Sequence, residues 1–282
     1  MDELSGKVAV ITGGASGIGL ALARRLAAES MSLVIADIEQ SALDAAVSAL
    51  SETTEVIGVR ADVSKYDEVE SIATAAVERF GAIHLAVNNA GVALGGQMWD
   101  LTIEDWQWVL GVDLWGVIHG MKAFVPRLIA SGGGHIVNTA SMAGLTSLPF
   151  MGPYNVSKHG VVTLSETLYA ELALLHPEVG VTVVCPGWVR TGINRSERNR
   201  AATGNAGEAV ATVPKGEDGI GSIVDGLIAG GIDPDEVATL IVAAVKAGDL
   251  YVLTHPDWTP MVTRRADGIV AGINPEVTIP GL

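Results

Sequence analysis

Short apolar runs alternate with amphipathic stretches along most of the chain. The apolar runs are rich in β-branched residues, as buried strands are, and the stretches between them carry apolar residues at helical spacing. Repeated strand–helix units imply right-handed crossovers and helices on both faces of a parallel sheet. The sequence therefore predicts an α/β fold with a doubly wound parallel sheet. The expected strands are residues 7–12, 33–36, 54–60, 84–88, 134–140, 179–185 and 251–253, and the expected helices are residues 21–30, 41–52, 65–80, 102–130, 154–175 and 234–247.

The regular alternation breaks after residue 191. Residues 192–231 are rich in Gly, small and charged residues with weak periodicity. A long irregular segment inside a domain is usually a functional lid or a disordered segment, and we expect a lid over the substrate. The tail, residues 254–282, carries Trp258, Met261 and several prolines. We expect this tail to pack on the domain or on a neighbouring subunit.

Composition restricts the class of protein. With 282 residues, 49% of them apolar, the chain is long enough for one large domain, and we assign residues 1–282 to it. The formal net charge of −15 argues against nucleic-acid and anionic membrane partners. Six His lack ligand spacing and Cys185 is the single cysteine, so we expect neither a metal site nor an internal disulfide. No signal peptide and no uncharged apolar run of ~20 residues is visible, which favours a cytoplasmic protein.

A glycine-rich loop joins the first expected strand to the first expected helix. It contains Gly13, Ser16, Gly17, Ile18 and Gly19. Bare backbone N–H groups and the positive end of the helix dipole would face a pyrophosphate there, and glycines let the phosphate approach. The spacing is Gly-x-x-x-Gly-x-Gly, which differs from the common Gly-x-Gly-x-x-Gly. A tight turn alone could need these glycines, but the position between strand and helix favours a Rossmann-type dinucleotide site.

Asp37 ends the second expected strand, about twenty residues after the glycines. A carboxylate at this place can accept hydrogen bonds from the adenine-side ribose and repel a 2′-phosphate. Neither Ile38 nor the glycine loop offers a basic side chain for that phosphate, so the sequence predicts NAD in preference to NADP. The alternative is that Asp37 only caps the following helix.

Two further polar groups follow strands of the same sheet. Asp62 comes after the third expected strand, and the turn Asn88-Asn89-Ala90-Gly91 ends the fourth. The carboxyl ends of parallel strands line the ligand crevice of such sheets. Helix capping by Asp62 and ordinary turn chemistry at residues 88–91 remain alternatives.

Ser141, Tyr154 and Lys158 form a candidate catalytic set. Tyr154 and Lys158 lie four positions apart, one turn on the same face of a helix. A free phenol titrates near pH ~10, and a cation ~4 Å away at an effective dielectric of ~20 would favour the phenolate by about 4 kcal/mol. Tyr154 is then a general acid/base, Lys158 lowers its pKa, and Ser141 holds the substrate oxygen. An exposed Tyr–Lys pair on an amphipathic helix is the alternative.

Two long expected helices carry more apolar surface than one side of a sheet needs. Trp106, Trp108 and Trp115 lie in the first of them, and the helix after Tyr154 is apolar around much of its circumference. This excess favours a subunit interface, with core packing as the competing explanation. We expect a homodimer or a homotetramer.

The motifs together resemble the short-chain dehydrogenase/reductase family, from about residue 6 to residue 253. The glycine loop, the Asn-Asn-Ala-Gly turn, Ser141, Tyr154-x-x-x-Lys158 and Pro186-Gly187 stand in family order and spacing. The resemblance implies that hydride moves between a nicotinamide and a carbon bearing oxygen. It also implies that Lys158 holds the nicotinamide ribose. The remaining cofactor contacts implied by the family are Asp62 and Val63 at the adenine, Asn89, Ala90 and Gly91, Pro186 and Gly187, and Val189 and Thr191 near the nicotinamide amide.

One position departs from the family pattern. Members usually carry Asn in the middle of the long helix, where it supports a water relay to the Lys, whereas this chain has Asp113. We therefore expect Asp113 to belong to the catalytic set and to alter the proton path. An apolar substrate wall is expected from Met142, Leu148 and Trp188, together with Leu94, Phe150 and Met151, although each could equally be a core residue.

These observations predict an NAD-dependent oxidoreductase that acts on a bulky, hydrophobic secondary alcohol or its ketone. Two alternatives stay open: an NADPH-dependent carbonyl reductase, which Asp37 disfavours, and a dinucleotide-binding redox sensor without turnover, which the Ser–Tyr–Lys set disfavours.

Overall fold

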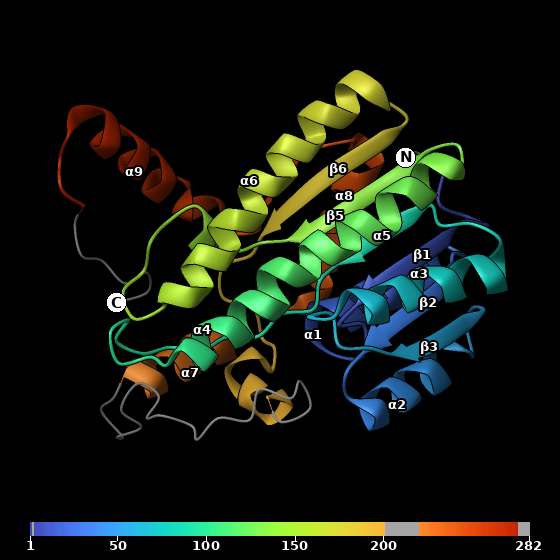
Figure 1. The fold of residues 1–282 in the computed structure, drawn as a ribbon, viewed down its shortest axis with the longest axis horizontal. Coiled ribbons are helices and arrows are strands. Elements are labelled where there is room, and N and C mark those ends of the chain that lie inside the picture. Colours follow the sequence, from blue (N-terminus) through green and yellow to red (C-terminus); the bar gives the residue numbers. More distant parts are fainter. Residues whose placement is uncertain (2, 201–219, 276–282) are drawn as a thin grey trace.

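A parallel sheet of seven strands forms the centre of the protein (Figure 1). The computed structural model describes residues 1, 3–200 and 220–275. The strand order is β3-β2-β1-β4-β5-β6-β7, and every neighbouring pair is parallel. The prediction of a single doubly wound α/β domain is confirmed. The strands are β1 Val8–Thr12, β2 Ser32–Asp37, β3 Val56–Arg60, β4 Leu85–Asn88, β5 Gly134–Thr139, β6 Val179–Cys185 and β7 Tyr251–Leu253.

Helices cover both faces of this sheet. One apolar core lies between the sheet and α1, α2 and α8, and a second lies between the opposite face and α3, α4, α5 and α6. Burial of the central strands β1, β2, β4, β5 and β6 explains their continuous apolar runs, whereas the edge strands β3 and β7 are partly exposed. The helices are α1 Gly17–Ala28, α2 Gln40–Leu50, α3 Tyr66–Phe80, α4 Ile103–Leu110, α5 Gly116–Ala130, α6 Gly152–Leu175, α7 Ile220–Ala229, α8 Pro234–Ala247 and α9 Thr259–Ala271.

The strand order changes direction between β1 and β4. Chain connections leave the sheet in opposite directions there, which opens a crevice at the carboxyl ends of the two strands. The Thr12 hydroxyl, at the end of β1, accepts hydrogen bonds from the backbone N–H groups of Asn89 at 3.0 Å and Ala90 at 3.2 Å. These bonds fix the glycine loop and the Asn-Asn-Ala-Gly turn side by side.

The long helix expected over residues 102–130 is present but is not uniform. Thr102 and Asp105 form the expected capping box. Between α4 and α5 the chain makes a π-helical turn, Gly111–Trp115, which contains Asp113. A π-turn widens the helix by one residue and often marks a functional site. Ile103–Ala130 is long and apolar enough to cross a membrane, but core helices pass the same test, and 56% of its most apolar window is buried.

The segment 192–231 contains more regular structure than the sequence predicted. Ile193–Asn199 forms 3-10 turns and Ile220–Ala229 forms α7. Apolar residues at 220, 223, 224, 227 and 228 have helical spacing, but Gly221, Gly226 and the neighbouring glycines weaken this signal. The middle of the expected lid, residues 201–219, lies outside the described residues.

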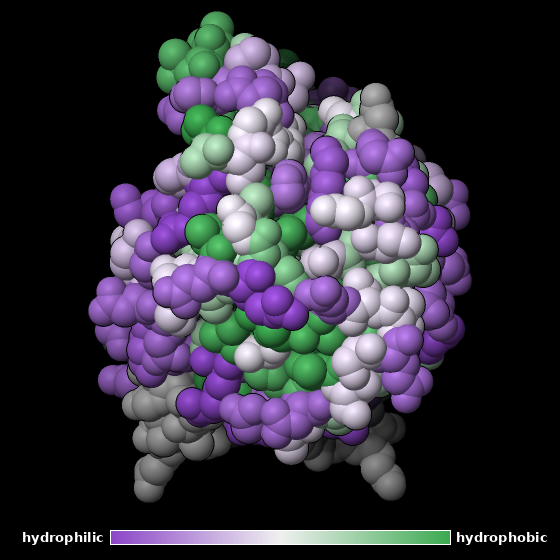
Figure 2. Space-filling model, turned by 90° about the vertical axis from the view of Figure 1, so that its right-hand side faces the viewer, coloured by the Kyte–Doolittle hydropathy of each residue, from purple (hydrophilic) through white to green (hydrophobic). Residues whose placement is uncertain are grey.

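The C-terminal segment begins on the domain and then leaves it. The backbone N–H of Gly187 donates to the Thr254 hydroxyl at 3.2 Å, Pro256–Trp258 then forms a 3-10 turn, and α9 projects from the body (Figure 1). Val270 at the end of α9 is 89% exposed. Residues 276–282 of the expected tail lie outside the described residues. Hydrophilic residues cover much of the face in Figure 2, around a smaller hydrophobic area, as is usual for a surface that meets water.

Candidate active site

The glycine loop forms one wall of a long cavity at the carboxyl edge of the sheet. Gly13 has a positive φ of +62°, and a Cβ there would lie 2.8 Å from the Ala90 Cα atom. A Cβ on Gly19 would collide with the Gly13 carbonyl oxygen. Gly19 therefore packs behind the wall, whereas Gly13, Ser16, Gly17 and Ile18 line the cavity. This open helix N-terminus is suited to hold a pyrophosphate.

Asp37 lies at the end of β2, beside the glycine loop. Its two carboxylate oxygens accept hydrogen bonds from the backbone N–H groups of Ala15 and Glu39, each at 3.1 Å. Burial raises the pKa of Asp37, the backbone hydrogen bonds oppose this, and the Glu39 charge adds to it. The carboxylate also lines the cavity, where its remaining lone pairs can accept from a ribose diol.

Asp62 lies in the turn before α3, whose N-cap is Lys65, so Asp62 is not the cap of this helix. Its Oδ1 accepts from the Ser64 backbone N–H at 3.0 Å and from the Ser64 hydroxyl at 2.7 Å, so it stabilises the turn before α3. Asp62 and Val63 also line the cavity, next to Ala61. The remaining residues expected at the cofactor all line the same cavity: Asn89, Ala90, Gly91, Pro186, Gly187, Val189 and Thr191.

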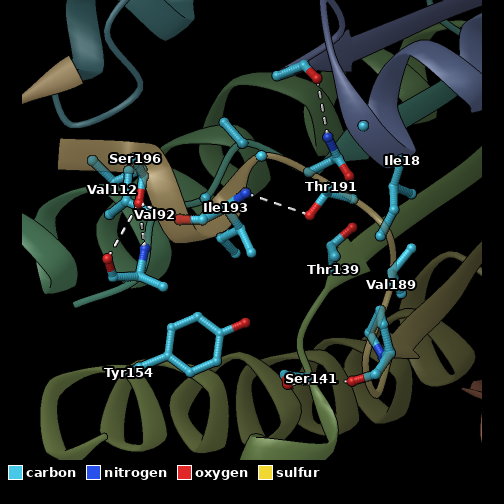
Figure 3. Close-up of a pocket in the computed structure, with 18 of the residues that line it drawn as sticks. Ile18, Val92, Val112, Thr139, Ser141, Tyr154, Val189, Thr191, Ile193 and Ser196 are labelled. Atoms are coloured by element: carbon cyan, nitrogen blue, oxygen red, sulfur yellow. Dashed lines mark hydrogen bonds between the residues drawn. The ribbon is translucent and has the colours of Figure 1, made fainter. Parts of the chain in front are cut away.

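Ser141, Tyr154 and Lys158 meet at the other end of the cavity. Tyr154 lies in the first turn of α6, and its hydroxyl points into the open space near Ser141 and Thr139 (Figure 3). Lys158 Nζ lies 5.4 Å from the centroid of the Tyr154 ring and donates to the Thr139 carbonyl oxygen at 3.1 Å. The Ser141 hydroxyl donates to the Pro186 carbonyl oxygen at 3.3 Å. A buried phenol, a cation and a hydroxyl therefore adjoin the space where a dinucleotide would end.

Comparison with known proteins agrees with this arrangement. A family model described as short chain dehydrogenase matches residues 7–202. The chain belongs to the short-chain dehydrogenase family. A short-chain dehydrogenase/reductase from Burkholderia phymatum, solved in complex with NAD, is 42% identical with a TM-score of 0.94 over 99% of both chains.

Two curated relatives extend the comparison. The CLA biosynthesis dehydrogenase/reductase of Lactiplantibacillus plantarum is 33% identical over 99% of this chain and 98% of its own length. The D-beta-hydroxybutyrate dehydrogenase of Rhizobium meliloti is 38% identical over 66% of this chain and 72% of its own length. An oxidoreductase with a nicotinamide dinucleotide cofactor is the activity that these relatives support.

The position that departs from the family pattern lies directly behind this short-chain dehydrogenase site. Asp113 Oδ2 is 3.2 Å from Lys158 Nζ, and both side chains are buried. Asp113 Oδ1 accepts from the Val92 backbone N–H at 2.8 Å. Burial raises the pKa of Asp113, against the opposing effect of the Lys158 ammonium. Burial alone would lower the pKa of Lys158, but the charges of Asp113 and Tyr154 outweigh it and raise that pKa.

Lys158 acts on the phenol in the expected direction, but the pKa of Tyr154 is raised overall. Burial raises the pKa of Tyr154, Lys158 lowers it, Asp113 raises it again and the Ser141 hydroxyl lowers it, with a net increase. The loss of water around the phenol and the carboxyl group of Asp113 behind the cation together outweigh the effect of Lys158.

The cavity also has an apolar part. Met142, Leu148, Met151 and Trp188, all expected there, line it. Leu94 is buried in the core behind α4 and α6, and Phe150 lies outside the lining with a positive φ of 63°. The structure adds a residue that the sequence did not indicate. Trp258 from the C-terminal segment lines the cavity, with its ring centroid 6.2 Å from that of Trp188.

Proposed function

We propose that this short-chain dehydrogenase is NAD-dependent and transfers hydride between a bulky, hydrophobic secondary alcohol, or its ketone, and the nicotinamide. The observation that carries the proposal is the Tyr154 hydroxyl, which opens into the same cavity as the glycine loop and lies beside Ser141 and Lys158. A redox sensor without turnover would not need this set of groups.

The cofactor would lie along the carboxyl edge of the sheet. The glycine loop fits the pyrophosphate, and Asp37 fits the adenine-side ribose. Asp62 and Val63 would flank the adenine, and Val189 and Thr191 the nicotinamide end. A 2′-phosphate beside the Asp37 carboxylate would be repelled, which supports NAD in preference to NADP.

Each residue around the phenol would have a separate role in proton transfer. When bound, the nicotinamide accepts or supplies the hydride. In alcohol oxidation Tyr154 takes the hydroxyl proton, and the Ser141 hydroxyl donates a hydrogen bond to the substrate oxygen. Lys158 opposes the effect of burial on the phenol. Asp113 does not line the cavity, so we assign it as a positioning residue that orients Lys158 and weakens its field.

The apolar end of the cavity supports the substrate class. Met142, Leu148 and Trp188 offer hydrocarbon and aromatic surface but no charge, so a bulky apolar group would be favoured there. Ile193 and Ile228 line the same cavity from the two described ends of the segment 192–231. Their position supports a substrate-covering role for this segment.

The surface of α5 and α6 supports a homo-oligomer. A shallow groove between the two helices is lined mainly by apolar side chains, and Trp115, at the end of the π-turn, is 53% exposed. A second copy packed on these helices would cover this area, as in a homodimer or a homotetramer. The apolar residues of the groove are Leu114, Ile118, Met121, Leu164 and Leu168.

The test is a panel of hydrophobic secondary alcohols with NAD, followed by the absorbance of NADH, on the wild type and on Tyr154→Phe. We expect turnover by the wild type and a loss of about a hundredfold or more in kcat for the variant, because no general base remains. Tyr169→Phe changes an exposed tyrosine on the same helix and should have wild-type kcat. Equal rates for Tyr154→Phe and wild type would contradict the proposal.

A further inference from the structure

Most residues of the segment 191–199, which follows β6, line the cavity, and the segment contacts Glu39 through Arg198 and Asn199. Arg198 donates to Glu39 Oε1 from Nε at 3.0 Å and from Nη2 at 2.7 Å, and Asn199 Nδ2 donates to the same oxygen at 3.0 Å. The three residues line the cavity. These contacts lower the pKa of Glu39 against the effect of burial, so the carboxylate is ionised at neutral pH.

This cluster lies next to the expected ribose site. Glu39 is two residues after Asp37 and donates its backbone N–H to Asp37 Oδ1. If Asp37 binds the adenine-side ribose, as proposed above, then a 2′-phosphate on that ribose would lie close to Glu39 and Arg198. The sequence around Asp37 offers no basic residue for such a phosphate, whereas the fold brings Arg198 to Glu39 from 159 positions away.

We propose that Glu39 is a second determinant of cofactor choice, and that it acts by neutralising Arg198. An arginine guanidinium binds phosphate through two parallel N–H donors. In this protein the Nε and Nη2 donors of Arg198 are already occupied by Glu39. A 2′-phosphate would therefore meet two carboxylates and an arginine whose charge is compensated. The inference rests on the proposed orientation of the dinucleotide.

Arg198 would stay in place without Glu39. Its Nη1 donates to the Arg195 carbonyl oxygen at 2.7 Å and to the Gly192 carbonyl oxygen at 3.2 Å, within its own segment. These bonds hold the guanidinium at the edge of the cavity when the carboxylate is removed. A neutral residue at position 39 would then leave a positioned, uncompensated cation beside the ribose.

The experiment compares binding of NADH and NADPH, each measured by the fluorescence of the reduced nicotinamide, in a double-mutant cycle of Glu39→Gln and Arg198→Gln. We expect Glu39→Gln to raise the preference for NADPH, as the ratio of the two dissociation constants, by about tenfold or more, because the guanidinium can then pair with the 2′-phosphate. Arg198→Gln alone should not raise it, and the double variant should lose the gain of Glu39→Gln.

The controls separate the possible explanations. Glu55→Gln removes the same charge from a surface pair with Arg79 and should leave the ratio unchanged. An unchanged ratio in Glu39→Gln overturns the inference, and so does a gain that persists in the double variant, because repulsion alone would then explain it. Binding needs no substrate, so a wrong substrate class would not affect this result. A wild type that binds neither dinucleotide would overturn both the proposed function and this inference.

Discussion

Asp113 Oδ2 lies 3.2 Å from Lys158 Nζ in the protein interior, where the family usually places an Asn. The ammonium therefore interacts electrostatically with Asp113 on one side, and Asp113 opposes its effect on the phenol of Tyr154 on the other. In a short-chain dehydrogenase with a neutral amide at this position, the field of the lysine would act on the phenol without that compensation.

The first prediction concerns the variant Asp113→Asn. Asp113 raises the pKa of Tyr154, so a neutral side chain should lower that pKa. Oxidation needs the phenolate, and we expect the acidic limb of the kcat/KM profile for alcohol oxidation to move by about one unit to lower pH, equivalent to about 1.4 kcal/mol. The measurement is kcat/KM against pH for both proteins. Superimposable profiles would show that Asp113 does not affect the pKa of Tyr154.

The second prediction concerns the aromatic end of the cavity. The rings of Trp188 and Trp258 meet edge to face, and Trp258 also packs on His255 with the centroids 5.0 Å apart. We expect 1-phenylethanol to be oxidised faster than 1-cyclohexylethanol, in which a saturated ring replaces the phenyl ring. Trp258→Leu should reduce kcat/KM for the phenyl substrate about three- to tenfold, because aromatic pairs contribute ~0.5–1.5 kcal/mol beyond the buried area.

Two further variants make this comparison specific. Trp258→Phe keeps a ring and should retain most of the phenyl preference. Trp99→Leu removes an indole that is 80% exposed and should behave as wild type. An equal loss for the phenyl and cyclohexyl substrates in Trp258→Leu would assign Trp258 a packing role without aromatic selectivity.

The third prediction concerns assembly. Thr163 is an exposed residue of α6 in the groove between α5 and α6. Arginine at this position should fit the isolated protomer but place a charge within the proposed interface. Thr163→Arg should therefore have a smaller mass in light scattering after gel filtration than the wild type. Thr239→Arg on the exposed side of α8 should not, and two unchanged masses would place the interface elsewhere.

The fourth prediction concerns acid stability. His135 on β5 is buried, its Nε2 lies 2.7 Å from the Thr182 hydroxyl, and burial lowers its pKa to about 4 from the ordinary value of 6.5. The fold favours the neutral ring, so this contribution to stability is complete above about pH 6.5 and is lost as pH falls towards 4. The total is about 3 kcal/mol.

Denaturant titrations at several pH values test this contribution. The free energy of unfolding of the wild type should fall more steeply between pH 6.5 and 4 than that of His135→Gln, which has no imidazole to protonate. His176→Gln alters an exposed histidine and should retain the wild-type slope. Identical slopes for the wild type and His135→Gln would contradict the assignment.

The sequence by itself determined the sheet, most of its helices and the main residues of the cavity. Buried parallel strands have continuous apolar runs, and the loops at their carboxyl ends must meet at one edge, so local patterns were enough to bring the glycine loop, Asp37, Ser141 and Tyr154 together. The capping box of Thr102 and Asp105 was also predictable from local sequence, because its bonds join residues three positions apart.

Only the tertiary structure decided the features that depend on burial or on contacts between distant segments. The π-turn at Asp113 has no distinct composition, and the net rise in the pKa of Tyr154 depends on how completely water is excluded. The Glu39–Arg198 contact joins residues 159 positions apart. Such contacts depend on how the folded chain brings distant segments together. Neither periodicity nor spacing in the sequence predicts this.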